Sequence, residues 1–252
     1  MAKPTIFITN DDGFRSKGIS SLIEAAREFG NLIVVAPNNS KSGQSQALTV
    51  KDIIRVNKMV EEEGLTIYRS SGTPTDCVKF AIRELGLKPD LILSGVNHGI
   101  NSSISVHYSG TLGAAKEGAL SGYPSVAFSL DNFGADPDFS NTKDVIKKLI
   151  PMVLEKGLPE GVCLNVNVPD VKELKGIKVC RQAHGRWMEK FEKHKDPHGQ
   201  DYYWLTGNFE VLEPEAQDTD EWFLRNGYAS VVPTNIDTTA YQIMEEIKNW
   251  GL

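Results

Sequence analysis

The sequence has few of the features of secreted, membrane-spanning or zinc-binding proteins. Its three cysteines, Cys77, Cys163 and Cys180, are widely spaced and form no C-x-x-C pair, which argues against a disulfide framework or a zinc ribbon. No apolar run approaches the roughly 20 residues that span a bilayer. The N-terminal stretch MAKPTIFITNDDG has no signal-peptide core. We therefore expect a cytoplasmic protein that does not enter a membrane.

The chain also lacks an excess of basic residues. Its formal net charge is −6 at pH 7, whereas proteins that bind nucleic acids in general, or anionic membranes, carry a basic excess. This balance argues against general nucleic-acid binding and leaves room only for a local basic site. With 252 residues, of which 40% are hydrophobic, the chain is long enough for one large α/β domain, alone or with an appended subdomain.

Common nucleotide-binding motifs are missing as well. The sequence contains no Walker motif, and no G-x-G-x-x-G follows the first predicted strand, so P-loop NTPases and dinucleotide-binding enzymes lose support. The spacing of the acidic residues is not that of an EF-hand loop. A nucleotide or metal site in this chain must therefore be built differently.

Apolar strand-like segments alternate with helix-like segments over the first 170 residues. Near-continuous apolar runs such as TIFIT and LIVVAP are typical of a parallel sheet that is covered on both faces. The predicted strands cover residues 5–9, 32–37, 123–130 and 161–169, and the stretch PDLILSGVNHG at 89–99 gives a further core strand with a polar exit. Shorter strand-like runs lie at 47–56 and 65–70. The predicted helices cover residues 17–29, 74–85, a segment from about 111, and 141–158, and a last helix is predicted over 238–250. Thr73, Pro74 and Asp76 form a capping-box pattern at the start of the second helix. This alternation predicts an α/β fold with a mostly parallel sheet.

The composition changes after about residue 171. Residues 172–195 hold six Lys and two Arg against three Glu, and residues 208–224 hold six acidic residues and no Lys or Arg. Aromatic residues crowd the stretch DYYWLTGNF between them. We predict a core over residues 1–171 and a β-rich arm with a C-terminal helix over residues 172–252, which takes part in oligomerisation. For any single charge here, a solvated hairpin face is the simpler interpretation.

Oxygen-bearing side chains follow four of the predicted strands. The stretch NDDG follows the first strand, NNSKSGQS the second, VNHGINSS the third, and SLDN ends the fourth. One such stretch is ordinary turn chemistry. Ligands of open parallel sheets bind outside the carboxyl ends of the strands. Four polar stretches at these ends therefore predict a binding site at that edge of the sheet.

Two adjacent carboxylates, Asp11 and Asp12, stand at the end of the first strand. Asn-Asp-Asp-Gly is good turn chemistry, and an Asp can cap the next helix, but a turn explains one of the two like charges better than both. A divalent cation would balance them. The other candidate ligands, Ser42 and Asn97, also offer oxygen, and such a set suits Mg²⁺, Mn²⁺ or Ca²⁺ rather than Zn²⁺.

The stretch YSGT, residues 108–111, indicates phosphate binding. It directly precedes a predicted helix, whose N-terminus offers unpaired N–H groups and a partial positive charge to an anion. Ser109 and Thr111 add hydroxyl donors, and Gly43 beside Ser42 could add a second N–H contact. The alternative is that the hydroxyl group serves only as a helix N-cap.

Taken together, these motifs resemble the SurE family of survival-protein 5′/3′-nucleotidases. TNDDG, VAP followed by SG at 42–43, SSGTPTDCV, SGVNHGIN and YSGTLGAAKEGA occur in this order. The resemblance is strong over residues 1–130 and looser through RQAHGRW and DYYWLTG. The combination is specific, although no single motif is. The resemblance implies a Rossmann-like three-layer core with a smaller β-rich C-terminal subdomain.

The resemblance also implies an activity and a set of site residues. The expected activity is hydrolysis of nucleoside 5′- and 3′-monophosphates, with one Mg²⁺ or Mn²⁺ per subunit. The implied metal ligands are Asp11, Asp12, Ser42 and Asn97, and either aspartate is a candidate to accept a proton from water. The implied phosphate or substrate contacts are Asn10, Gly43, Asn101, Ser109, Gly110 and Thr111. The family dimerises by exchange of C-terminal segments, so we expect a homodimer or homotetramer.

Two other interpretations stay open at this point. Haloacid-dehalogenase-like phosphatases use an aspartate nucleophile within D-x-D-x-T, whereas the aspartates here are adjacent and followed by Gly13 and Phe14. A non-enzymatic nucleotide-binding or metal-sensing module would use the same crevice without turnover. His98 and His107 are isolated histidines, so loop or partner contacts explain them more simply than a general-acid role.

Overall fold

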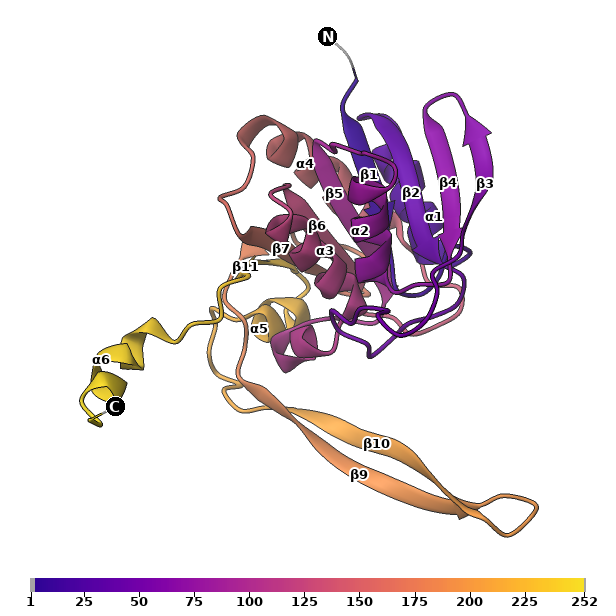
Figure 1. The fold of residues 1–252 in the computed structure, drawn as a ribbon. Helices are drawn as coiled ribbons and strands as arrows, with labels where there is room; N and C mark the ends of the chain where they lie inside the picture. Colours follow the sequence, from indigo (N-terminus) through magenta and orange to yellow (C-terminus); the bar gives the residue numbers. More distant parts are fainter. Residues whose placement is uncertain (1–2, 252) are drawn as a thin grey trace.

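The computed structural model describes residues 3–251 and contains a mixed sheet with helices on both faces and a long hairpin that extends away from it (Figure 1). The strands of the large sheet are β1 (Thr5–Thr9), β2 (Asn31–Pro37), β3 (Val56–Glu62), β4 (Leu65–Ser70), β5 (Leu91–His98), β6 (Ser125–Leu130), β7 (Val162–Val168), β8 (Ile177–Val179) and β11 (Ala229–Asn235). The hairpin consists of β9 (Gly185–Lys195) and β10 (Asp201–Val211). The helices are α1 (Lys17–Ala26), α2 (Pro74–Arg83), η1 (Ser103–His107), α3 (Gly110–Leu120), α4 (Ser140–Lys156), α5 (Asp220–Arg225), η2 (Tyr241–Ile243) and α6 (Met244–Lys248).

The order of the strands is β3-β4-β2-β1-β5-β6-β7-β11-β8. The six strands from β4 to β7 in this order are all parallel to one another. The strand β3 is antiparallel to β4, and β11 is antiparallel to β7. The predicted α/β class with a mostly parallel sheet is therefore confirmed. The parallel strands all direct their carboxyl ends to one edge, where ligands of such sheets bind.

The central strand β1 shows how the three layers are held together. Successive side chains of a strand point to opposite faces. Ile6 and Ile8 pack in the cluster that contains residues of α1 and α4, whereas Phe7 packs in the cluster that contains residues of α2 and α3. All three side chains are fully buried. An apolar run with no polar alternation thus forms a strand that is covered on both faces.

Helix boundaries follow local chemistry in most places. Thr73 caps α2, Pro74 opens it, and Asp76 completes a capping box, as the sequence predicts. The helix α1 ends at Ala26, earlier than predicted, and the predicted C-terminal helix over 238–250 is reduced to the short η2 and α6.

The prediction of a strand-like run over residues 47–56 was wrong for most of that segment, because β3 begins only at Val56. The backbone N–H of Thr49 donates to the carboxylate of Asp76, and that of Arg55 donates to the hydroxyl of Ser71. Side-chain acceptors therefore replace a strand partner along this segment. Its apolar residues, including Val50 and Ile53, stay exposed.

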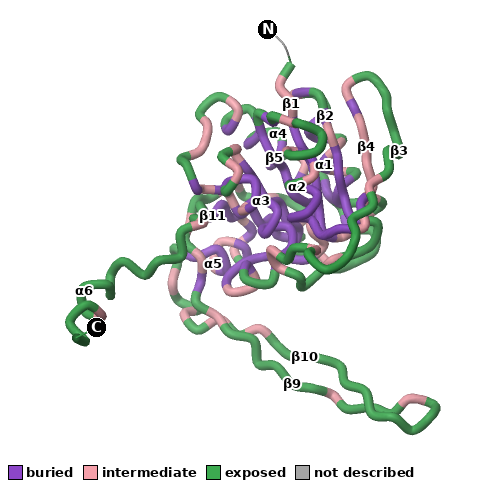
Figure 2. Tube along the Cα trace, viewed as in Figure 1, coloured by how far each residue is buried: buried purple, intermediate pink, exposed green. Residues whose placement is uncertain are grey.

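The segment after residue 171 divides between the sheet and the surface. Strands β8 and β11 belong to the large sheet, whereas β9 and β10 pair only with each other. Figure 2 shows a mostly buried body and a largely exposed hairpin and C-terminal segment. The division of the chain at residue 171 stays a prediction. Within 172–252, the hairpin and α6 are the parts that leave the body (Figure 1).

Two further features bear on the chain's environment. Among residues 3–251, no helix combines the length and the apolar character that crossing a membrane requires. Cys77, Cys163 and Cys180 are free thiols, and Cys77 and Cys163 are buried. A buried thiol of this kind acts as a small apolar side chain in the core.

Candidate active site

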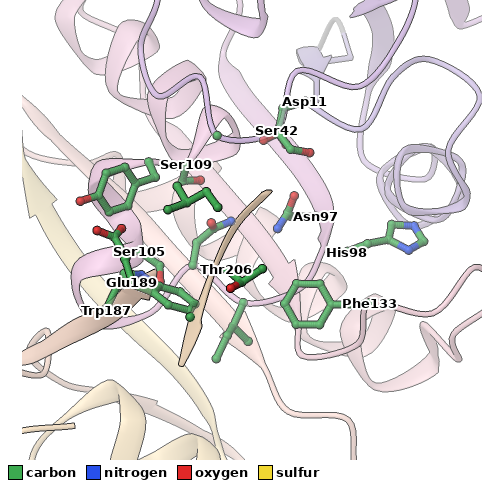
Figure 3. Close-up of a pocket in the computed structure, with 16 residues that line it drawn as sticks. Asp11, Ser42, Asn97, His98, Ser105, Ser109, Phe133, Trp187, Glu189 and Thr206 are labelled. Carbon is green, nitrogen blue, oxygen red and sulfur yellow. The ribbon is translucent and has the colours of Figure 1, made fainter. Parts of the chain in front are cut away.

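A cavity of about 700 Å³ opens at the carboxyl edge of the sheet (Figure 3). Its volume lies within the roughly 300–1,000 Å³ of small-molecule sites. Six residues predicted from the sequence line it, namely Asp11, Ser42, Gly43, Asn97, Asn101 and Ser109. They come from the loops after β1 and β2, from the end of β5 and the loop after it, and from the start of α3. The fold therefore brings together polar stretches that are up to about 100 residues apart in the chain.

Asp11 is held at the floor of the cavity by the start of α3. Its side chain is only 3% exposed, and the hydroxyl of Thr111 donates a hydrogen bond to Oδ1. A Cβ atom at Gly110 would come within 2.9 Å of both Cβ and Oδ2 of Asp11. A glycine at position 110 is therefore what allows α3 to approach the carboxylate this closely.

The two carboxylates have unfavourable surroundings for their charges. Burial raises the pKa of Asp11 to about 6; the charge of Asp12 adds to this effect, and the Thr111 hydrogen bond opposes it. Burial also raises the pKa of Asp12, whose Oδ2 accepts from the backbone N–H of His98 at 3.0 Å. Within residues 3–251, neither carboxylate forms an ion pair with Lys, Arg or His. This arrangement suits a cation from outside the chain.

Asn10 fixes the turn rather than lining the cavity. Its Nδ2 donates to the carbonyl of Gly13 at 3.0 Å and to the hydroxyl of Ser16 at 2.9 Å. Ser16 is also the N-cap of α1. The Oδ1 atom of Asn10 is buried and has no hydrogen-bond partner among the described residues. The turn after β1 is thus connected rigidly to the next helix.

The loop after β2 lies against the loop after β1. The backbone N–H of Lys41 donates to the carbonyl of Asp11 at 2.7 Å, which brings Ser42 and Gly43 to the cavity. The hydroxyl groups of Ser40 and Ser42 are 2.8 Å apart. Ser42 thus has one protein partner and still faces the cavity (Figure 3).

Asn97 reaches the cavity from the end of β5. The pairing of β5 with β6 shifts register between Ser94 and Asn97, and such irregularities re-aim side chains next to functional sites. The Nδ2 atom of Asn97 donates to the carbonyl of Gly99 at 2.6 Å. Because the amide nitrogen is held by this bond, the oxygen is the end of the side chain that is left for a ligand.

The predicted phosphate contacts already have structural partners. The Ser109 hydroxyl accepts from the backbone N–H of Leu112 at 3.0 Å, which is an N-cap. The Thr111 hydroxyl is used by Asp11, and neither Gly110 nor Thr111 lines the cavity. The Nδ2 atom of Asn101 donates to Ser129 at 2.8 Å. Ser109 and Asn101 nevertheless face the cavity, so the N-cap and the ligand interpretations of Ser109 are compatible.

The opposite wall of the cavity consists of residues that the sequence motifs do not indicate. Trp187 and Glu189 of β9 and Gly207 of β10 line it, as does Phe133 from the loop after β6. Figure 3 shows Trp187 and Glu189 close together, across the cavity from Asp11 and Ser42. The only hint in the sequence is the spacing of Trp187 and Glu189, which places both on one face of a strand. Nothing local indicates which part of the chain that face approaches.

The predicted donor set suits a hard divalent ion. Asp11, Ser42 and Asn97 line the cavity, whereas Asp12 is half-buried next to Asp11 and does not itself line it. Two carboxylates, a hydroxyl and an amide oxygen are ligands that Mg²⁺ and Mn²⁺ accept. Among residues 3–251, no three His, Cys, Asp or Glu side chains gather in a way that could hold a metal. A zinc centre of the usual type is thus not supported, whereas an oxygen site with two carboxylates fits.

Comparisons with known proteins find similar chains over almost the whole length. The family model described as "Survival protein SurE" matches residues 6–189. The chain is 48% identical to the "5'-nucleotidase SurE" of Phocaeicola vulgatus, over 99% of this chain and 98% of that protein. It is 51% identical to the protein of the same name from Flavobacterium psychrophilum, over 100% and 99%. The crystal structure of the SurE protein from Aquifex aeolicus superposes with a TM-score of 0.83 at 38% identity, covering 99% of this chain and 100% of that one. This chain therefore belongs to the survival protein SurE family.

Proposed function

We propose that this protein is a 5′-nucleotidase, which hydrolyses nucleoside 5′-monophosphates, and 3′-monophosphates as well, to nucleoside and phosphate. The observation that carries this proposal is the adjacent pair Asp11 and Asp12 at the carboxyl edge of the sheet, where Asp11 is buried and lines a cavity of about 700 Å³ and Asp12 is half-buried beside it. No Lys, Arg or His among residues 3–251 forms an ion pair with either carboxylate. The chain belongs to a family whose members include proteins named 5′-nucleotidase, and this supports the same activity.

Asp11, Asp12, Ser42 and Asn97 would hold one Mg²⁺ or Mn²⁺ per subunit. Such an ion, when bound, polarises the phosphate and makes a water molecule more acidic. The hydroxyl of Thr111 orients Asp11, and the backbone N–H of His98 orients Asp12. Because both carboxylates are held before the substrate arrives, little reorganisation is needed during the reaction.

The start of α3 would bind the phosphate group. Its first N–H groups carry partial positive charge and directly follow Ser109, which lines the cavity. Gly43 and Asn101 would add polar contacts from two other loops, and Asn10 would keep the turn in place. One of the two aspartates would accept the proton of the attacking water.

Phosphate release tests this proposal. The purified protein should release inorganic phosphate from AMP or GMP with Mn²⁺ or Mg²⁺ and lose this activity in excess chelator. Nucleotide binding without any phosphate release would favour the non-enzymatic binding module. A trapped covalent aspartyl-phosphate would favour the mechanism of haloacid-dehalogenase-like enzymes. Full activity in chelator, with no metal found by elemental analysis, would contradict the role of the ion.

We further propose that residues beyond about 180 hold a homodimer or homotetramer together by exchange of C-terminal segments. The hairpin and the C-terminal segment expose several large apolar side chains, among them Phe191, Trp204 and Trp250. Large exposed apolar patches on a protein usually mark interaction surfaces. Light scattering at micromolar concentration should report a dimer or a larger species, and a compact monomer would contradict the proposal.

We also propose a cytoplasmic location. The three cysteines are free thiols, and thiols stay reduced in the cytosol.

A further inference from the structure

One face of the hairpin forms a wall of the active-site cavity. Trp187 and Glu189 are two residues apart in β9, so their side chains point to the same face. In the register of the hairpin, Phe209 lies opposite Trp187, and Gly207 lies opposite Glu189. Trp187, Glu189 and Gly207 all line the cavity that Asp11 also lines. The aromatic ring of Trp187 and the carboxylate of Glu189 therefore lie across the cavity from Asp11 (Figure 3), and Gly207 adds a strip of backbone without a side chain to the same wall.

Glu189 differs from the other carboxylates of the hairpin. Glu192 pairs with Lys190 at 2.7 Å, Asp201 pairs with Lys193 at 2.6 Å, and Glu210 pairs with Arg186 at 2.8 Å. Among the described residues, Glu189 takes part in no ion pair. Its carboxylate is thus an acceptor that faces a cavity and is not used by the fold.

Gly207 and Phe209 shape the space beside Glu189. A Cβ atom at position 207 would lie 2.6 Å from the carbonyl oxygen of Met188 and 3.0 Å from Cα of Glu189. A side chain at this position would therefore be strained, and its absence leaves a flat strip next to the carboxylate. The ring of Phe209 lies 5.5 Å from that of Trp187, at an angle of 59°. This contact holds Trp187 on the cavity side.

The base of the hairpin is fastened to the wall of the site. The carboxylate of Asp220, in α5, accepts from the backbone N–H of Ser103 and from that of Ala183, both at 2.9 Å. The Ser103 hydroxyl donates to the carbonyl of Ala183 at 2.8 Å. Ser103 begins η1, which contributes Ser105 to the cavity, and Ala183 lies two residues before β9. The hairpin face therefore keeps a defined position relative to the catalytic groups.

We propose that Trp187, Glu189 and Gly207 form a nucleobase subsite that prefers guanine. The subsite rests on the proposed nucleotidase function, because it requires the phosphate to lie at the start of α3, next to the metal ligands. A base stacks on Trp187 over the glycine strip, as bases stack on aromatic residues in other sites. The N1–H and N2–H groups of guanine are two adjacent donors, which match the two oxygens of Glu189. Adenine presents a lone pair at N1, which the carboxylate repels.

Substrate kinetics test the subsite. We expect the parent protein to favour GMP over AMP in kcat/KM by about tenfold or more, which corresponds to one hydrogen bond to a charged group. Glu189→Gln should lower the GMP-to-AMP ratio by about tenfold. Trp187→Ala should lower kcat/KM for both nucleotides. Ribose 5-phosphate, which carries no base, should be hydrolysed equally by all three proteins.

Glu192→Gln is the matched control, because Glu192 lies on the same strand three residues away and points to the other face. It should leave the GMP-to-AMP ratio unchanged. The proposal is overturned if Glu189→Gln leaves that ratio unchanged, or if ribose 5-phosphate turnover falls in parallel. If the parent hydrolyses none of these esters, the proposed function fails, and calorimetry with guanosine and adenosine decides on the subsite. Tighter guanosine binding that Glu189→Gln removes supports it, and equal binding overturns it.

Discussion

The two walls of the cavity are built in opposite ways. At the sheet edge, Asp11 is 3% exposed and oriented by groups from a different element, Thr111 and Gly110 of α3. On the hairpin, Trp187 is 39% exposed and its strand pairs only with its neighbour. Catalytic groups must be held in place before the substrate arrives, whereas a base can be recognised by a surface that is partly open to solvent.

The difference also concerns stability. The edge is part of a large sheet with a core on both faces, and a two-stranded hairpin is at best marginally stable in water on its own. The position of the hairpin therefore depends on what fastens its base, which in this chain is Asp220. Changes at the edge should act mainly on turnover, whereas changes along the hairpin should act mainly on substrate choice and on assembly.

The largest effect is expected for Asp11→Asn and Asp12→Asn. Turnover of a nucleoside monophosphate should fall by orders of magnitude in at least one variant, because a negative ligand is lost. In the parent, Mn²⁺ at about 100 times its Kd should raise the free energy of unfolding by about 2.7 kcal/mol. The same Mn²⁺ concentration should raise the free energy of unfolding of the variants far less. Without metal, the variants should melt at or above the parent temperature, since a buried charge is removed.

These quantities require melting curves of all three proteins with and without Mn²⁺, together with phosphate-release assays. A plain turn explains the pair of aspartates equally well if the metal-induced shifts are the same in all three proteins and activity is kept. Asn is as good as Asp in turns and caps, so the substitution separates a ligand role from a turn role.

The next largest effect is expected for Asp220→Asn. An amide cannot accept both backbone N–H groups of Ser103 and Ala183 as the carboxylate does. Loss of one hydrogen bond to a charged group should lower the free energy of unfolding by about 1.5–3 kcal/mol. Denaturant titration measures this loss. Asp218→Asn is the control, because Asp218 is exposed and pairs with Arg181. This substitution should lower the free energy of unfolding by about 1 kcal/mol or less. Equal losses in both variants would contradict the fastening role.

A smaller effect is expected for Ser109→Ala. Loss of the N-cap of α3 should lower the free energy of unfolding by about 1 kcal/mol, and loss of a phosphate contact should raise KM in the folded enzyme. Thr219→Ala removes the corresponding N-cap of α5, away from the cavity, and should reduce stability similarly without changing KM. If the two variants behave alike in kinetics, Ser109 serves only as a cap.

The smallest effect is expected for the exposed ion pair between Lys190 and Glu192. Both side chains are well exposed, and such pairs contribute about 0–1 kcal/mol. Glu192→Gln should therefore change the free energy of unfolding by less than about 1 kcal/mol, with no effect on turnover. A large loss of stability in this variant would show that the hairpin is supported by its surface charges rather than by the contacts at its base.

Several elements could be predicted because their signals are local. The capping box at Thr73 and Asp76 and the buried strand at residues 5–9 depend on neighbours a few residues away. The stretch NDDG follows this strand at the carboxyl edge of the sheet, as its turn chemistry predicts. The run at 47–56 shows the limit of such signals, because side chains from other elements, such as Asp76, bind the backbone there.

The sequence by itself determined the α/β class, the parallel strands and the set of oxygen donors after them, because apolar periodicity and turn chemistry act over short distances. Only the tertiary structure decided that Thr111 holds Asp11 and that β8 and β11 extend the sheet. It also decided that the hairpin face of Trp187 and Glu189 forms one wall of the cavity. These contacts join residues that are far apart in the chain, and their energy comes from packing and hydrogen bonds that no local pattern encodes.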